Sequence, residues 1–177
     1  MIFISAGHHL KDSGAIGNGT QENKEMISFR DLVCQRLDEK GVKYIKDNDT
    51  ETLNEYFDRI KTGEGSVVVE FHLDSSENKS ATGTTALVGN DARSNDIRLA
   101  KDLVNETAYT LWIKNRGVKT EAESHRGRLR IMREAGAVCL LEICFLSNPE
   151  DMKNYNKWKG SLAARIADVL EKHENLA

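Results

Sequence analysis

The amino-acid sequence predicts an α/β domain with a mostly parallel, twisted sheet and helices on both of its faces. Apolar runs of strand length alternate with longer segments whose apolar residues recur at helical spacing. The runs at residues 2–6, 67–72 and 138–148 are dense in apolar residues, which is typical of strands buried on both faces. The 177 residues contain one proline, no low-complexity tract and no internal repeat, so we expect a single domain over residues 1–177.

The composition is that of an ordinary soluble globular protein, with 39% hydrophobic and 30% charged residues. The formal net charge of −3 argues against a general phosphate-binding surface, so nucleic acid is not an expected partner. Cys34, Cys139 and Cys144 are an odd set, which favours buried reduced thiols and folding in the cytosol. No apolar stretch reaches the length of a membrane span and the N-terminus lacks a basic leader. We therefore expect no integral membrane segment, no signal peptide and a protein that is cytoplasmic when made.

The first half of the chain predicts three short strands and two helices. The strands are expected at residues 2–6, 42–45 and 67–72. A glycine-rich loop over residues 7–19 follows the first strand, and Glu22 then opens a helix that Gly41 ends. Thr50 or Thr52 caps the second helix.

The second half begins with an expected edge strand at residues 82–88, after which Ser94 caps a long helix. Residues 114–133 are basic and polar and are expected to form a substrate-facing loop. After the apolar run, Pro149 occupies the first position of a short helix, and residues 158–170 form the last amphipathic helix.

Glu142 interrupts the apolar run at residues 138–148 with a single carboxylate. An ionised Glu is rarely left in such a strand without a cation, a metal or a set of hydrogen-bond donors. Glu142 therefore predicts a partner elsewhere in the chain.

Three further residues of suitable chemistry gather at the same edge of the predicted sheet. His8 and His72 lie at strand ends, and Glu22 begins the helix after the first strand. Two imidazoles and a carboxylate suit a catalytic zinc ion, which commonly takes three protein ligands. The alternatives are core histidines held by hydrogen bonds and a helix acid that complements the macrodipole.

Five segments resemble, in family order, the motifs of the zinc-dependent N-acetylmuramoyl-L-alanine amidases of bacterial wall turnover and phage lysis. Gly-His and Asp-Ser-Gly-Ala open the series, followed by Gly-Thr-Gln-Glu, Phe-His-Leu-Asp-Ser, Asn-Arg-Gly-Val and Leu-Glu-Ile-Cys-Phe-Leu-Ser-Asn. These segments lie at residues 7–17, 19–22, 71–75, 115–118 and 141–148. The resemblance covers nearly the whole chain.

The resemblance implies that His8, Glu22 and His72 bind Zn²⁺ and that Glu142 is the catalytic carboxylate. It implies a single catalytic domain that cleaves the amide between N-acetylmuramic acid and L-alanine in peptidoglycan. A phage-lysin-like, monomeric enzyme that reaches the wall by another route is the expected biological form. The alternatives are another zinc-dependent peptidase or amidohydrolase and a catalytically silent wall-binding module.

The chain departs from the family pattern at several positions near the expected site. His9 and Leu10 replace two glycines, Glu70 replaces a serine and Asp74 replaces an asparagine. Cys144 stands in place of a glycine. None of these changes removes a ligand, so we expect an active enzyme with an altered substrate preference.

Glu70 has three possible roles: an alternative metal ligand, a solvated edge residue, or a partner that orients His72. The last of these fits best, because alternation along a strand puts Glu70 and His72 on the same side.

The basic segment before the last strand carries His125, Arg130 and Arg133. Its default interpretation is a solvated surface. Because stem peptides carry carboxylates, we expect Arg133 or Arg130 to bind substrate through a bidentate contact.

Overall fold

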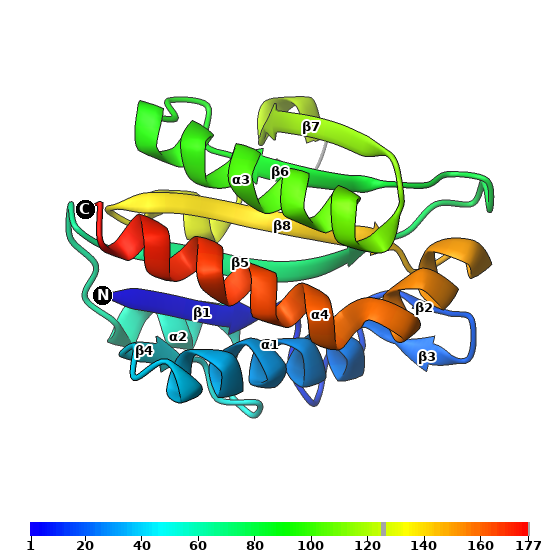
Figure 1. The fold of residues 1–177 in the computed structure, drawn as a ribbon, viewed down its shortest axis with the longest axis horizontal. Coiled ribbons are helices and arrows are strands. Elements are labelled where there is room, and N and C mark those ends of the chain that lie inside the picture. The colour runs from blue at the N-terminus through cyan, green and yellow to red at the C-terminus, as the bar shows by residue number, and fades with distance from the viewer. Residues whose placement is uncertain (125–126, 177) are drawn as a thin grey trace.

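The computed structural model describes residues 1–124 and 127–176, so the predicted candidate His125 lies outside the described residues. Its main sheet has six strands in the order β4–β1–β5–β8–β6–β7 (Figure 1). In that order the strands are Tyr44–Lys46, Ile2–Ala6, Val67–Asp74, Ala137–Phe145, Thr84–Val88 and Asn115–Thr120. Neighbouring strands run parallel except β6 and β8, which confirms the mostly parallel sheet.

Helices cover both faces of this sheet, as predicted. Three long helices lie on one face, with α4 between the other two (Figure 1). They are α1 (Glu22–Glu39), α3 (Ser94–Leu111) and α4 (Pro149–Glu174). The other face carries the short α2 (Leu53–Arg59) and a 3₁₀ turn at Arg130–Arg133, while a second 3₁₀ turn, Ala122–Ser124, follows β7. A small hairpin of β2 (Ile16–Gly17) and β3 (Thr20–Gln21) precedes α1.

Local capping explains where two of these helices begin. Thr52 forms a capping box with Glu55, whose backbone N–H donates to Thr52 Oγ1 at 3.2 Å. The Asn148 side chain accepts from the backbone N–H groups of Glu150 and Asp151, and Pro149 takes the first helical position. Such caps satisfy N–H groups that have no partner inside the helix.

The structure corrects four expectations about individual elements. The strand expected at the sheet edge, β6, lies between β8 and β7 and is buried along its whole length, so the edge belongs to the polar β7. The described residues between 114 and 133 therefore include a strand and two 3₁₀ turns instead of one loop. The helix after Pro149 runs unbroken to Glu174, so the two helices expected in this region are one. Ser94 is the first residue of α3, and Arg93 is the N-cap.

Two apolar clusters lie on opposite faces of the sheet, and the side chains of β5 contribute to both. Val67, Val69 and Phe71 pack in the larger cluster beneath α1, α3 and α4, and Val68 packs in the smaller one beneath α2. Alternation along the strand puts the side chains of Glu70 and His72 on the same face as Val68. On this face of the sheet, the C-terminal half of β5 therefore carries polar side chains.

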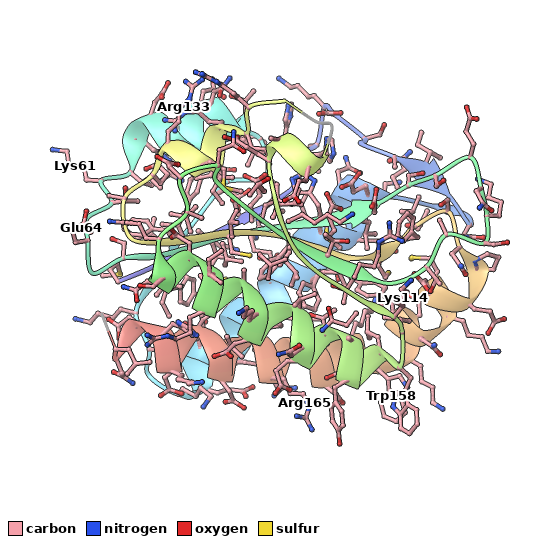
Figure 2. All side chains as sticks on the ribbon, turned by 90° about the horizontal axis from the view of Figure 1, so that it is seen from above. Lys61, Glu64, Lys114, Arg133, Trp158 and Arg165 are labelled. Atoms are coloured by element: carbon pink, nitrogen blue, oxygen red, sulfur yellow. The ribbon has the colours of Figure 1, made fainter. Side chains whose placement is uncertain are left out.

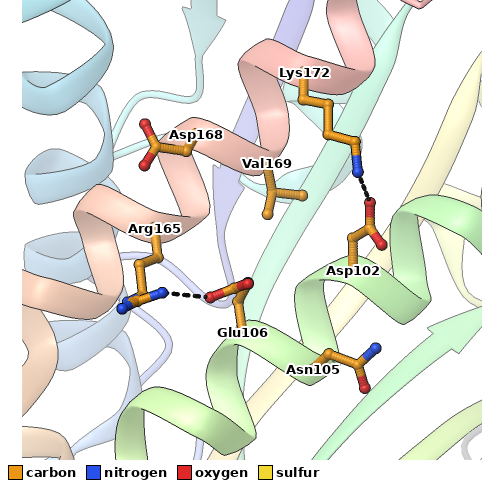
Figure 3. A pocket seen from close by; sticks show the side chains of 7 residues that line it. All are labelled: Asp102, Asn105, Glu106, Arg165, Asp168, Val169 and Lys172. Atoms are coloured by element: carbon orange, nitrogen blue, oxygen red, sulfur yellow. Dashed lines mark hydrogen bonds and ion pairs between the residues drawn. The ribbon is translucent and has the colours of Figure 1, made fainter.

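A groove between α3 and α4 lies on the opposite face of the sheet from His72. Four of its charged side chains pair across it: Arg165 Nη1 lies 3.0 Å from Glu106 Oε2, and Lys172 Nζ lies 2.8 Å from Asp102 Oδ2 (Figure 3). These pairs join the two helices. Among the residues that the structure describes, no helix is both long and apolar enough to cross a membrane.

Candidate metal centre and active site

His8, Glu22 and His72 lie together where β1, α1 and β5 meet. Each offers one ligand atom, and the three atoms lie within 4.8 Å of one another. His72 Nδ1 is 2.9 Å from Glu22 Oε1, and His8 Nε2 is 3.2 Å from Glu22 Oε2. The structure therefore brings the three predicted ligands to one point.

The outer nitrogen of each histidine ring is held by a second carboxylate. His8 Nδ1 donates to Asp12 Oδ2 at 2.8 Å, and His72 Nε2 donates to Glu70 Oε1 at 2.7 Å. Histidine ligands of metals usually have such a partner, which fixes the ring so that the other nitrogen faces the ion. His8 Nε2 and His72 Nδ1 accordingly face Glu22.

Asp12 is a member of this arrangement that sequence reasoning did not single out. Its second carboxylate oxygen accepts from the Gly14 N–H at 3.1 Å, which closes the loop around His8. The signal available in the sequence was an acid four residues after a histidine within a glycine-rich loop.

The Glu22 carboxylate is buried and held by backbone donors. Ala15 N–H donates to Oε2 and Leu73 N–H donates to Oε1, each at 3.0 Å. Burial raises the pKa of Glu22, but hydrogen bonds from His72, His8 and the Ala15 N–H outweigh it and bring the pKa well below its usual range. Glu22 is therefore an anion with a fixed position.

The surrounding carboxylates raise the pKa of both histidine rings. Burial lowers the pKa of His72, but hydrogen bonds to Glu22 and Glu70 and the charges of Glu70 and Glu142 raise it to about 10. The pKa of His8 is raised as well, by Glu22 and Asp12 against the effect of burial. The carboxylates thus favour positive charge between the two rings. A divalent cation between the same nitrogens would supply the same charge, so the donor set fits a metal ion such as zinc.

The backbone around this cluster leaves no room for larger residues. A Cβ atom on Gly7 would lie 2.4 Å from Cε1 of His72, and one on Gly14 would lie 2.5 Å from Cδ2 of His8 and 2.7 Å from Oε2 of Glu22. Gly14 and His8 have positive φ values of 60° and 69°. Such a φ is uncommon for a residue with a side chain and is often found at functional sites. The two glycines let the loop approach both rings.

Glu142 lies on β8 directly opposite His72 of β5, and opposite Thr85 of β6 on its other side. Its side chain is buried, with 2% of the residue exposed. It borders a hollow of about 230 Å³ between β8 and β7, and the lining residues are Asp74, Thr85, Leu87, Arg116, Lys119, Glu123, Ser124 and Glu142. The catalytic candidate thus stands between the histidine cluster and a cavity.

The two predicted substrate arginines lie elsewhere. Arg130 forms ion pairs with Glu134 and Asp58 at 2.5 and 3.1 Å. Arg133 borders a separate hollow with Glu64, and Figure 2 shows both at the end of the molecule opposite Lys114. The structure does not bring either arginine to the hollow beside Glu142, and their role in substrate binding stays a prediction.

Two curated relatives come from Bacillus subtilis (strain 168). The N-acetylmuramoyl-L-alanine amidase LytC is 30% identical over 173 residues, which are 94% of this chain and 34% of LytC. The uncharacterized protein YqiI is 31% identical over 122 residues, which are 67% of this chain and 59% of YqiI. The chain therefore spans between about a third and about three fifths of the length of these relatives.

A solved structure and a family model complete the comparison. An N-acetylmuramoyl-L-alanine amidase from Clostridium difficile 630 has the same fold, with a TM-score of 0.81 at 22% identity over 98% of this chain and 96% of that one. The family model described as N-acetylmuramoyl-L-alanine amidase matches residues 2–172. The chain belongs to the N-acetylmuramoyl-L-alanine amidase family.

Proposed function

We propose that this chain is an enzyme that hydrolyses the amide between the lactyl group of N-acetylmuramic acid and the L-alanine of the peptidoglycan stem peptide. The observation that carries the proposal is the cluster of His8, Glu22 and His72 with Glu142 on the adjacent strand. Membership of the amidase family supports this choice of bond over other amides.

We propose zinc as the metal, held by His8 Nε2, the Glu22 carboxylate and His72 Nδ1. Two imidazoles and one carboxylate are a ligand set of catalytic zinc sites. When bound, zinc supplies a Lewis acid that polarises the scissile carbonyl and makes water a better nucleophile near neutral pH. Asp12 and Glu70 keep the two rings in the required orientation by holding their outer nitrogens.

Glu142 moves the proton in the proposed reaction. One of its carboxylate oxygens accepts a proton from the attacking water and then donates it to the amide nitrogen, which is a poor leaving group until it is protonated. The products are a free lactyl carboxylate and a free amino group on L-alanine. The role of a base also gives a reason for a carboxylate within the apolar β8.

One chain supplies every residue of the proposed site. We propose a single catalytic domain over residues 1–177 that works as a monomer. Its proposed place of action is the cell wall, in wall turnover or in endolysin-like lysis.

Removal of the metal tests the proposed function. Metal-replete protein incubated with purified peptidoglycan should release stem peptides with a free L-alanine amino group, identified by mass spectrometry of the digest. A chelator should abolish the release and added Zn²⁺ should restore it, because the carbonyl and the water lose their activating ion.

Each other outcome contradicts a different part of this proposal. Release of C-terminal amino acids instead would identify a carboxypeptidase, and wall binding without any release would identify a silent module. Release that survives complete removal of the metal would rule out the zinc mechanism.

Replacement of Glu70 by serine, the residue usual in the family, should lower zinc affinity by about 10–100-fold, because His72 loses the partner that orients its ring. Competition with a chromophoric chelator measures this. Glu70→Gln should lose less, since its amide oxygen still accepts from His72 Nε2. The exposed Glu77 provides the control Glu77→Ser, and an affinity equal to wild type in Glu70→Ser would mean that Glu70 does not orient the ring.

A further inference from the structure

Two cations from β7 line the hollow beside Glu142. They are Arg116 and Lys119, and both are partly buried. Within residues 1–124 and 127–176, no carboxylate forms an ion pair with either of them, whereas Arg130 of the 3₁₀ turn pairs with two acids. The two cations therefore have no ion-pair partner among the described residues, although three carboxylates line the same hollow.

The strand register places these cations relative to the metal cluster. His72 of β5 is opposite Glu142 of β8, and Glu142 is opposite Thr85 of β6. On the far side of β6, Leu87 is opposite Lys119 of β7. Neighbouring strands lie about 4.8 Å apart, so β7 is roughly 10 Å from β8. The metal ligands, the proposed base and Lys119 thus follow one another across the same face of the sheet, and Arg116, which lies at the irregularity in β7, lines the same hollow.

Arg116 is held in place while some of its donors stay unused. Its guanidinium carbon lies 5.0 Å from the centroid of the Phe145 ring, and Nη1 donates to the Thr82 carbonyl at 3.4 Å. Its Nε is buried and makes no hydrogen bond to the described part of the chain. A stacked guanidinium with free donors is pre-organised for a planar, bidentate anion such as a carboxylate.

The acidic residues of the hollow do not occupy this position. Glu123 uses Oε2 to accept from the N–H and the hydroxyl of Thr120, each at 2.8 Å. Asp74 comes from β5, and Glu142 comes from β8. Two of the three acids thus lie toward the metal cluster, and Glu123, beside β7, is already bonded to Thr120.

We propose that Arg116 and Lys119 bind a carboxylate of the stem peptide, so that the peptide side of the cleaved amide lies over β6 and β7. This inference rests on the proposed function. The lactyl carboxyl group of the sugar is consumed in the scissile amide, whereas the stem peptide keeps its own carboxylates. A cationic wall beside the base consequently recognises the peptide and leaves the glycan on the side of β1.

Two synthetic muramyl peptides test this recognition, one with free carboxylates and one with the same groups as carboxamides. The wild type should show a KM about tenfold lower for the carboxylate substrate, and Arg116→Gln and Lys119→Gln should each raise that KM about tenfold. Their kcat should stay near wild type, because the lost contact is made equally in the ground and transition states. For the carboxamide substrate the variants should match the wild type.

Lys114→Gln is the matched control, since it removes the same charge from an exposed side chain that does not line the hollow (Figure 2). It should leave both KM values unchanged. Circular dichroism checks the fold of each variant. If Arg116→Gln does not fold, the two KM values are compared in Arg116→Lys and Lys119→Gln instead.

Two results would overturn the inference. One is a wild type with the same KM for the carboxylate and the carboxamide substrate. The other is a rise in KM that is equal for both substrates in Arg116→Gln and Lys119→Gln. If no protein cleaves either substrate, the proposed function fails separately. Calorimetric binding of the L-alanyl product peptide, as carboxylate and as carboxamide, then still decides whether Arg116 and Lys119 recognise the carboxylate.

Discussion

Glu142→Gln is expected to lower kcat by about 10²–10⁴-fold, the usual contribution of a general base and acid. Glutamine has nearly the same shape but can neither take a proton from water nor deliver one to the leaving nitrogen. Since Glu142 is 2% exposed and opposite His72 on the next strand, bulk water does not readily replace it. The rate of appearance of L-alanine amino groups from peptidoglycan measures the effect.

The same experiment requires that the variant keeps its metal. Glu142→Gln should bind zinc in the same stoichiometry as the wild type by elemental analysis, because Glu142 is not among the proposed ligands. Glu123→Gln serves as control, since Glu123 lines the same hollow but is exposed and bonds to Thr120. Near-normal turnover by Glu142→Gln would remove Glu142 from the mechanism, and loss of zinc would reassign it as a ligand.

The sequence predicted the architecture well where a local pattern determines it. The apolar runs of β1, β5 and β8 and the helical spacing of α1 and α3 reflect burial, which each segment encodes by itself. The neighbours of a strand are not encoded in the same way. β6 was expected at the edge because nothing within Thr84–Val88 reveals that β7 pairs beyond it, and the polar residues of β7 resemble a loop.

The same distinction between local pattern and tertiary contact applies to the candidate site. His8, Glu22 and His72 could be predicted because strand ends and motifs mark them, but their orientation depends on Asp12 and Glu70 through side-chain contacts. In the basic segment, charge and the resemblance to the family favoured Arg130 and Arg133. Only the folded structure shows which cations line the hollow beside Glu142, and these are Arg116 and Lys119, which precede the other two in the chain.

Arg30→Met is expected to destabilise the protein by about 3–5 kcal/mol, the usual effect of breaking a buried ion pair from one side. Arg30 on α1 is fully buried and donates to Asp47 at 2.8 Å and to Asp49 at 2.6 Å. Asp47 is buried too and accepts from the Ala6 N–H at the end of β1. Without the guanidinium, a buried carboxylate stays behind. Urea unfolding of the two proteins measures the difference.

The stability lost in Arg30→Met should depend on pH, because the Asp47 carboxylate can take up a proton. Burial raises the pKa of Asp47 to about 6 even beside Arg30, and removal of Arg30 should raise it further. Between the unfolded and folded pKa values the native state holds a proton that the unfolded state has released, so stability falls as pH rises through that window. The window extends to higher pH in the variant. Arg30→Met should therefore lose less stability at about pH 5 than at about pH 8.

A second substitution separates this cause from a packing defect. Asp47→Asn in the Arg30→Met background removes the buried charge, so it should recover part of the lost stability and abolish the extra pH dependence. A loss that is the same at both pH values and is not relieved by Asp47→Asn would assign the effect to packing around Met26 and Phe29 on the same helix. Asp47 accepts from the backbone N–H of Ala6, two residues before His8. Arg30→Met should therefore also bind zinc more weakly. The buried network of α1 would then support the metal centre from outside the site itself.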